Sequence, residues 1–141
     1  MFFIMSRKVA REVAFKIIFE LAFQHDEEAS KLFEKLIEAS EENYEITEED
    51  NAYVNEIIVG IQSNEPSIDE KIKSHLKDWS FDRISKVDLA ILRLAIYEIT
   101  YRKDIPCKVS VNEAVELAKI FGEESSPAFI NGILAEILKE I

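Results

Sequence analysis

The sequence predicts an all-α protein, and three observations support that prediction. The 141 residues include only 3 Gly and 3 Pro, too few turn residues for a many-stranded β fold. Hydrophobic residues make up 48% of the chain, enough for one packed core without disulfides or a metal. Apolar residues recur at helical spacing, and no stretch alternates strictly enough to predict a strand. We expect seven helices in two small bundles, three helices in the first and four in the second.

The first bundle is expected before Pro66. Apolar side chains at i, i+4 spacing predict a helix over residues 6–24, and the pattern repeats over 29–39. Thr47 precedes three carboxylates, which is typical of a helix start: the Thr side chain caps free amides, and carboxylates suit the positive end of the helix dipole. This third helix is expected to end at Ser63.

The boundary between the bundles is predicted at Pro66, because proline interrupts a helix. Residues 67–70 then have the pattern of a capping box that opens a short fourth helix. The expected organisation is a single domain over 6–141, with one subdomain over 6–65 and a second over 66–141.

Three longer helices are expected in the second bundle. The segment 82–102 is apolar almost all round, which is typical of the central helix of a bundle. A second capping box at 110–113 starts a helix with Gly122 as its C-cap. Ser126 followed by Pro127 predicts the start of the last helix, with a cap residue before a proline at the first helical position.

Charge is divided unevenly along the chain, although the net charge is -11. Residues 1–25 carry four basic and two acidic groups, and residues 71–110 carry nine basic and five acidic groups. Residues 26–70 carry 15 acidic groups and only two basic ones. A chain divided in this way has a basic footprint and a separate acidic face, which can serve two partners of opposite charge.

The expected compartment is the cytoplasm. Residues 1–5 are apolar but too few for a signal peptide, and we expect a disordered or mis-annotated extension there. No apolar run approaches the ~18 residues of a membrane span, so no membrane contact is expected. The single Cys107 excludes an internal disulfide framework and favours a reducing environment.

The sequence lacks the marks of an enzyme. None of the phosphate-binding, zinc-protease, hydrolase or paired-cysteine motifs occurs. His25 and His75 are isolated, and Cys107 has no histidine near it in sequence. We therefore expect no catalytic residue, no metal and no cofactor, and we interpret the chain as a binding protein.

Cations cluster where the first helix starts, at Arg7, Lys8, Arg11 and Lys16. Several long cationic side chains converging from one surface are what phosphate contact needs. The alternative is that these are solvating charges, or that they form helix-end salt bridges to Glu12 and the acidic segment.

Two further groups of side chains invite an interpretation. Phe15, Phe19 and Phe23 form an i, i+4 row that either anchors a protein partner or lies under another helix. Arg93 lies amid apolar residues, where an unpaired charge is costly, so it should pair with a carboxylate or with backbone carbonyls. We assign it, with Glu98, a structural role.

The second half of the chain carries a specific block of motifs. It reads NEAVELAK at 112–119, and Phe121-Gly122, Ser126, Phe129 and Asn131-Gly132 follow. Upstream come Trp79, Arg83, Asp88, Arg93, Tyr97-Glu98 and Ile105-Pro106, and the N-terminus supplies Arg7, Ala10-Arg11-Glu12 and Ala14. Together these residues resemble the NusB family of bacterial transcription antitermination proteins over essentially the whole chain.

The resemblance implies two helical bundles and a function. It implies binding of boxA RNA from ribosomal RNA operons together with NusE, a small-subunit ribosomal protein. The complex would join RNA polymerase and suppress premature termination. By itself the chain is expected to be a monomer or weak homodimer.

The resemblance also directs attention to particular residues. RNA contacts are expected at the start of the first helix and around the loop after Phe121, with Phe129 and Asn131 as additions; core packing is the alternative for both phenylalanines. NusE contacts are expected at Phe19 and its neighbours and, in the connection before the central helix, at Asp78 and Asp82. Trp79 joins Arg93 and Glu98 in the structural set.

Two alternatives to this function remain open. One is an RNA-binding module like the NusB-like domain of ribosomal RNA cytosine methyltransferases. The other is a helical protein-interaction adaptor without RNA contact, which fits the acidic balance but leaves the N-terminal cations unexplained.

Overall fold

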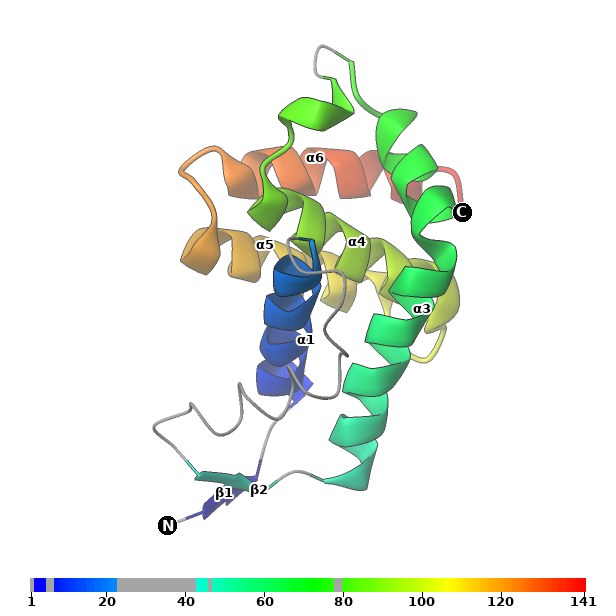
Figure 1. The fold of residues 1–141 in the computed structure, drawn as a ribbon. Coiled ribbons are helices and arrows are strands. Elements are labelled where there is room, and N and C mark those ends of the chain that lie inside the picture. The colour runs from blue at the N-terminus through cyan, green and yellow to red at the C-terminus, as the bar shows by residue number, and fades with distance from the viewer. Residues whose placement is uncertain (1, 5–6, 23–42, 46, 78–79) are drawn as a thin grey trace. The chain divides into compact units, whose positions relative to one another are not determined.

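The computed structural model describes residues 2–4, 7–22, 43–45, 47–77 and 80–141. That part of the chain contains the helices α1 (Arg7–Leu21), α3 (Glu48–Lys73), α4 (Lys86–Tyr101), α5 (Cys107–Phe121) and α6 (Ser126–Leu138) (Figure 1). A 3-10 helix, η1 (Phe81–Arg83), precedes α4. The fold is all-α as expected, but the prediction of seven helices in bundles of three and four is wrong. The described residues form five α-helices.

One reason for the lower number is that α3 continues through Pro66. The helix predicted to end at Ser63 and the one predicted to start at residue 67 are a single helix of 26 residues. An interior proline costs a helix about 3 kcal/mol. Here Ile61, Ile68 and Ile72 are all buried and share one face of α3, so side-chain burial on both sides of Pro66 outweighs that cost. The helix predicted over 29–39 lies outside the described residues.

The other helix starts also differ from the prediction. The central helix begins at Lys86 and not near Asp82, because Ser85 caps it by accepting a hydrogen bond from the Asp88 amide at 3.1 Å. α5 begins at Cys107, three residues before the predicted capping box. Ser110 is buried and donates to Glu98 Oε1 at 2.8 Å, so its hydroxyl serves a tertiary contact and caps nothing.

Two short strands form where the sequence predicts none. β1 (Phe2–Ile4), within the expected N-terminal extension, pairs in parallel with β2 (Asn43–Glu45). In this register Phe2 is opposite Asn43 and Ile4 is opposite Glu45. Each strand has only three residues, which is too short for an alternating apolar and polar pattern to be recognised in the sequence.

The chain divides into two compact units, residues 1–60 and 61–141, and the division falls within α3. In the first unit, the buried side chains of α1 include Ala10, Ala14 and Ile17. In the second unit, α4 contacts both α5 and α6 and is buried almost throughout, as its all-round apolar sequence predicts (Figure 1). None of the described helices has the length and hydropathy to cross a membrane.

Candidate functional site

Arg7, at the first position of α1, is tied to the start of α3. Its Nε lies 3.4 Å from Asp50 Oδ1, and a terminal guanidinium nitrogen lies 3.8 Å from Glu49 Oε1. Its guanidinium carbon also sits 4.3 Å from the centroid of the buried Tyr53 ring. Thr47 caps α3 here as predicted, because its hydroxyl accepts from the Asp50 amide at 3.0 Å. Arg7 thus makes the helix-end salt bridge to the acidic segment that the sequence left open.

The other three N-terminal cations differ in exposure. Arg11 is only 5% exposed, and its guanidinium carbon lies 5.9 Å from the Tyr53 centroid. Lys16 is half-buried, whereas Lys8 is exposed. The predicted cluster therefore presents Lys8, and parts of Arg7 and Lys16, at the surface of α1.

The predicted aromatic row divides in the same way. Phe15 is buried, so the core-packing alternative applies to it. Phe19 is half-buried, and its ring centroid lies 6.4 Å from that of Phe15. Phe23 lies outside the described residues, as do Asp78 and Trp79. Asp82 is exposed on η1.

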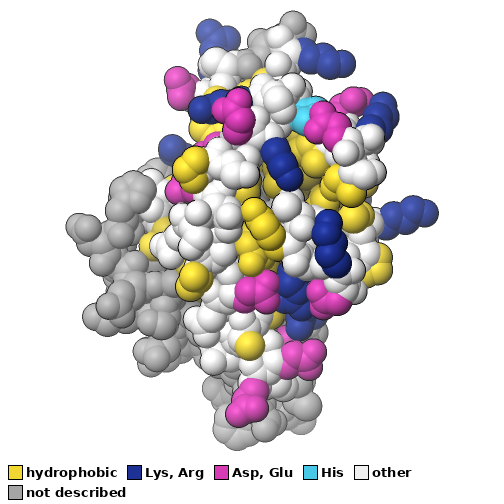
Figure 2. All heavy atoms as spheres, turned by 90° about the vertical axis from the view of Figure 1, so that its right-hand side faces the viewer, with side chains coloured by type: hydrophobic (Ala, Val, Ile, Leu, Met, Phe, Trp, Pro, Cys, Tyr) yellow, Lys and Arg dark blue, Asp and Glu magenta, His cyan; other side chains and the backbone are white. Residues whose placement is uncertain are grey.

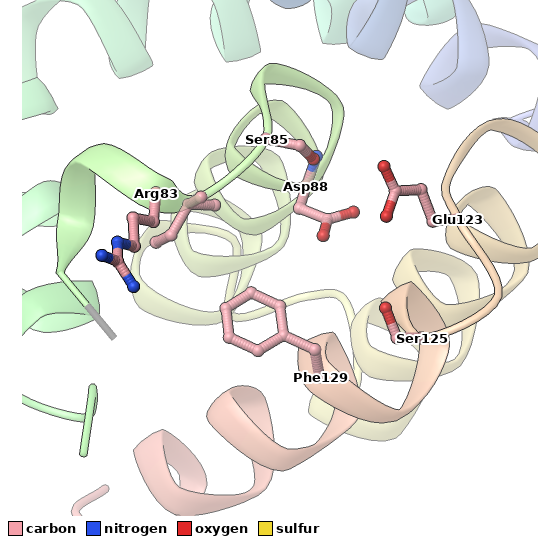
Figure 3. A pocket seen from close by; sticks show the side chains of 7 residues that line it. Arg83, Ser85, Asp88, Glu123, Ser125 and Phe129 are labelled. Atoms are coloured by element: carbon pink, nitrogen blue, oxygen red, sulfur yellow. The ribbon is translucent and has the colours of Figure 1, made fainter. Parts of the chain in front are cut away.

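A pocket of about 280 Å³ lies in the second unit (Figure 3). Its walls come from η1 and the connection to α4, from the first turn of α4, from the loop between α5 and α6, and from α6 itself. The lining residues are Arg83, Ile84, Ser85, Asp88, Glu123, Ser125 and Phe129. Phe129 supplies an aromatic wall, and the Asp88 and Glu123 carboxylates point toward each other across the pocket (Figure 3).

Asp88 gives this pocket its electrostatic character. Its Oδ1 is buried and has no hydrogen-bond partner within the described part of the chain. Burial raises the pKa of Asp88 above its ordinary value, and the like charge of Glu123 adds to the rise, while the hydroxyls of Ser126 and Ser85 oppose it. A buried acceptor without a partner is costly, so the pocket suits a ligand that brings N–H or O–H donors.

The loop between α5 and α6 is held by a close contact. Gly122 ends α5 as the predicted C-cap, with its amide donating to the Ala118 carbonyl at 2.9 Å. A Cβ on Gly122 would lie 2.6 Å from the Ser126 side chain and 2.8 Å from the Ala118 carbonyl oxygen. Ser126 is itself buried, and its hydroxyl accepts from the Glu123 amide at 3.0 Å. This contact positions Glu123 and Ser125 at the pocket.

The last helix begins slightly earlier than predicted. Ser125 is its N-cap position and Ser126 is already helical. Of the expected RNA-contacting residues in this region, only Phe129 lines the pocket. Phe121 is half-buried at the end of α5, and Asn131 is exposed on α6. Sequence reasoning named neither Asp88 nor Glu123 as a site residue, although Asp88 belongs to the family-like set and Glu123 lies in the loop after Phe121 that the resemblance indicated.

Arg93 and Glu98, two of the three expected structural residues, lie on α4 in the second unit. Arg93 has a carboxylate partner, one of the two alternatives that the sequence left open: its Nε and a terminal nitrogen donate to the two Asp69 oxygens at 2.9 and 2.8 Å. A terminal nitrogen also lies 2.8 Å from Glu65 Oε1. Glu98 is 1% exposed and accepts from Ser110. These contacts join α4 to α3 and to α5.

The fold and these surfaces together define a small all-α protein that presents cationic, aromatic and carboxylate side chains at helix starts. The model of the NusB family matches residues 8–139. A transcription antitermination protein NusB from Clostridium novyi (strain NT) is 44% identical over 135 residues, which cover 96% of this chain and 99% of that protein. The chain belongs to the NusB family.

Solved structures agree in fold. NusB of T. maritima matches with a TM-score of 0.85 and 37% identity, covering 97% of this chain and 93% of that one. A chain in the structure of antitermination factors NusB and NusE in complex with dsRNA matches with a TM-score of 0.82 and 26% identity, covering 96% and 97%. The resemblance inferred from the sequence motifs is thus confirmed.

Proposed function

We propose that this chain is a non-enzymatic transcription antitermination factor that binds boxA RNA of ribosomal RNA operons together with NusE. In this role it joins the antitermination complex on RNA polymerase, in the cytoplasm, and suppresses premature termination. The observation that carries the proposal is the likeness, along nearly the whole chain, to a structure of NusB and NusE with dsRNA. The name shared by curated relatives supports it.

The start of α1 is the proposed phosphate-binding surface. Lys8 is exposed there, and Arg7 is held in place by Asp50 and by the Tyr53 ring, which limits the side-chain entropy lost on binding. Arg11 is buried against Tyr53, so its larger contribution is to hold this end of the first unit together. Lys16 would be peripheral.

The pocket beside Phe129 is the proposed second contact. Single-stranded RNA is recognised through phosphate contacts and through bases stacked on aromatic rings and bonded at their edges. Phe129 offers a partly exposed ring, and Asp88 offers an acceptor for base N–H groups. Phe121 and Asn131 lie outside the pocket and would contribute from its surroundings.

Fluorescence anisotropy with labelled boxA RNA, with and without purified NusE, over a series of salt concentrations tests the proposal. The double variant Arg7→Ala, Lys8→Ala should bind more weakly, and its salt slope should fall by roughly one for each phosphate that the variant no longer neutralises. Lys119→Ala, Lys139→Ala is the matched control: it removes the same charge from two exposed lysines that pair with neighbouring glutamates on α5 and at the end of α6.

Two outcomes would redirect the proposal. An unchanged salt slope in the Arg7, Lys8 variant would remove the start of α1 from the RNA site. NusE binding without any boxA binding would favour the second candidate, a protein-interaction adaptor. That candidate has one observation in its favour, since Arg7 and Arg11 are already engaged within the first unit.

A further inference from the structure

His75 connects the end of α3 to the segment that follows α6. Its Nε2 lies 2.8 Å from Glu140 Oε1, and its Nδ1 lies 2.8 Å from the Lys71 carbonyl oxygen. The His75 side chain is 9% exposed and that of Glu140 is 64% exposed. The cyan histidine side chain in Figure 2 lies among acidic and basic side chains on this face. The contact therefore joins residues 65 positions apart at the surface of the second unit.

The chemistry of the two partners specifies the protonation state of this ring. A carbonyl oxygen and a carboxylate oxygen accept hydrogen bonds and cannot donate them. A neutral imidazole has a single N–H. In that form one ring nitrogen of His75 would direct its lone pair at an oxygen lone pair, with the two atoms only 2.8 Å apart. Only the imidazolium form, with an N–H on each nitrogen, satisfies both Lys71 and Glu140.

Ser74 fits the same assignment. Its hydroxyl oxygen lies 2.9 Å from the Lys71 carbonyl oxygen and 3.1 Å from His75 Nδ1. The hydroxyl can donate to the carbonyl and accept part of the Nδ1–H bond. Each of these three contacts then pairs a donor with an acceptor.

The surrounding charges also favour the imidazolium. The hydrogen bond to the Lys71 carbonyl raises the pKa of His75, the bond to Glu140 and the charge of Glu136 raise it further, and burial acts in the opposite direction. The positive charges of Lys77 and Lys139 act on Glu136, and Lys139 pairs with that carboxylate at 3.0 Å.

We propose that His75 and Glu140 form a proton-dependent clip, which holds residues 139–141 against the end of α3 when the imidazole is protonated and releases them when it is neutral. The backbone bonds of this segment are turn bonds of 3.1 to 3.3 Å, from the amides of Lys139, Glu140 and Ile141 to carbonyls of α6. Lys139, Glu140 and Ile141 are all exposed, and an exposed helix end of this kind frays readily. The inference does not depend on the proposed RNA-binding function.

The sign of the pH dependence follows from linkage. Because the folded-state pKa of His75 is raised, the clip contributes its full stabilisation below the ordinary value of 6.5 and loses it as pH rises through the folded-state value. Residues 139–141 should therefore be ordered in mildly acidic solution and frayed in alkaline solution.

NMR of the full chain labelled with ¹⁵N tests the clip between about pH 5 and about pH 9, the range that spans histidine titration. The ring nitrogen shifts of His75 should report N–H on both nitrogens at low pH. Heteronuclear NOE values of amides 139–141 should fall with a midpoint equal to the pKa of His75. In Glu140→Ala the pKa of His75 should drop, and these amides should be mobile across the whole range.

Glu116→Ala is the matched control, since it removes an exposed glutamate from α5 that pairs with Lys119. This variant should keep the wild-type midpoint. The proposal is overturned if His75 titrates at or below the ordinary histidine value. It is also overturned if amides 139–141 show the same order at every pH, or if Glu140→Ala behaves like the wild type.

Discussion

Arg93 is a cation in the middle of α4, which is buried almost throughout, and two carboxylates of α3 hold its guanidinium. Its side chain is 12% exposed and that of its bidentate partner Asp69 is 15% exposed, so water screens this pair little. Glu65 adds a third contact from a more exposed position. An arginine–carboxylate pair of this geometry is directional, and it fixes the rotation of α4 relative to this part of α3.

Arg93→Ala should lower the free energy of unfolding by about 3 kcal/mol, because it leaves Asp69 partly buried without its counter-charge. Urea denaturation followed by circular dichroism measures the change. Lys119→Ala breaks an exposed pair on α5 and should cost less than about 0.5 kcal/mol. Equal effects of the two substitutions would show that the Arg93 pair contributes no more than a surface pair.

Asp88 differs from Arg93 in lacking a partner for one of its charged atoms: its buried Oδ1 has no hydrogen-bond partner within the described residues. Because burial raises its folded-state pKa, ionised Asp88 destabilises the fold above that pKa and costs nothing below its ordinary value of 3.8. Asp88→Asn should therefore raise the melting temperature at neutral pH, and its advantage over the wild type should vanish as pH falls toward 3.8.

Differential scanning calorimetry at several pH values measures this difference. Asp82→Asn, an exposed carboxylate on the neighbouring η1, is the control and should change the melting temperature little at any pH. A lower melting temperature for Asp88→Asn at neutral pH would mean that the favourable charge at the start of α4 outweighs burial.

At the scale of elements, helix ends depend on contacts that lie outside the helix. Ser85 and Ser110 are equally good cap residues in sequence, yet Ser85 caps α4 while Ser110 is turned to Glu98. Pro66, the strongest breaker signal in the chain, is an exposed residue within α3. At Ser110 and at Pro66, tertiary contacts and the burial of neighbouring side chains decide where the helix runs, because most helical stability comes from packing.

Replacing Gly122, which follows α5, and Gly132, which lies within α6, by alanine should change the stability of the protein in opposite directions. A Cβ on Gly122 would lie 2.6 Å from Ser126 and 2.8 Å from a backbone oxygen that cannot move away, so Gly122→Ala should destabilise the loop and the pocket. Gly132 lies within α6, with nothing within 4 Å of its added Cβ, so Gly132→Ala should stabilise by about 0.5 to 1 kcal/mol. Thermal melts of both variants give the comparison, and the same sign for both would contradict it.

At the scale of the whole molecule, the chain combines an acidic balance with cations at defined places. The net charge of -11 opposes contact with nucleic acid over most of the surface, so we expect local cations such as Lys8 to direct RNA to one place. The same acidic balance suits a basic protein partner, since opposite charges speed encounter while buried aromatic rings supply most of the affinity.

Phe19 is the aromatic residue we expect to anchor NusE. It is half-buried beside Phe15, so part of its ring is available to a partner. Phe19→Ala should weaken NusE binding by at least about 1 kcal/mol without unfolding the protein. Isothermal titration calorimetry measures the dissociation constant. An equal constant for variant and wild type would place the partner surface elsewhere, with exposed Asp82 as the next candidate.

The sequence by itself determined the all-α fold class and the family. Apolar spacing in α1 and α4 is a local property, and both helices appear with most of their predicted length. The cap at Thr47 and the C-cap at Gly122 are also local, because each involves residues three or four positions apart. The apolar neighbours of Arg93 alone predicted that it needs a polar partner, either a carboxylate or backbone carbonyls.

Only the tertiary structure decided which residues meet. The partner of Arg93 is 24 positions away, and nothing in the local pattern singles out Asp69 among the acidic residues of α3. The contact of Arg7 with Asp50 spans 43 positions, and it divides the N-terminal cations into an engaged Arg7 and an exposed Lys8. Burial depends on the whole packed unit, so sequence spacing can name the charged side chains but not their partners or their exposure.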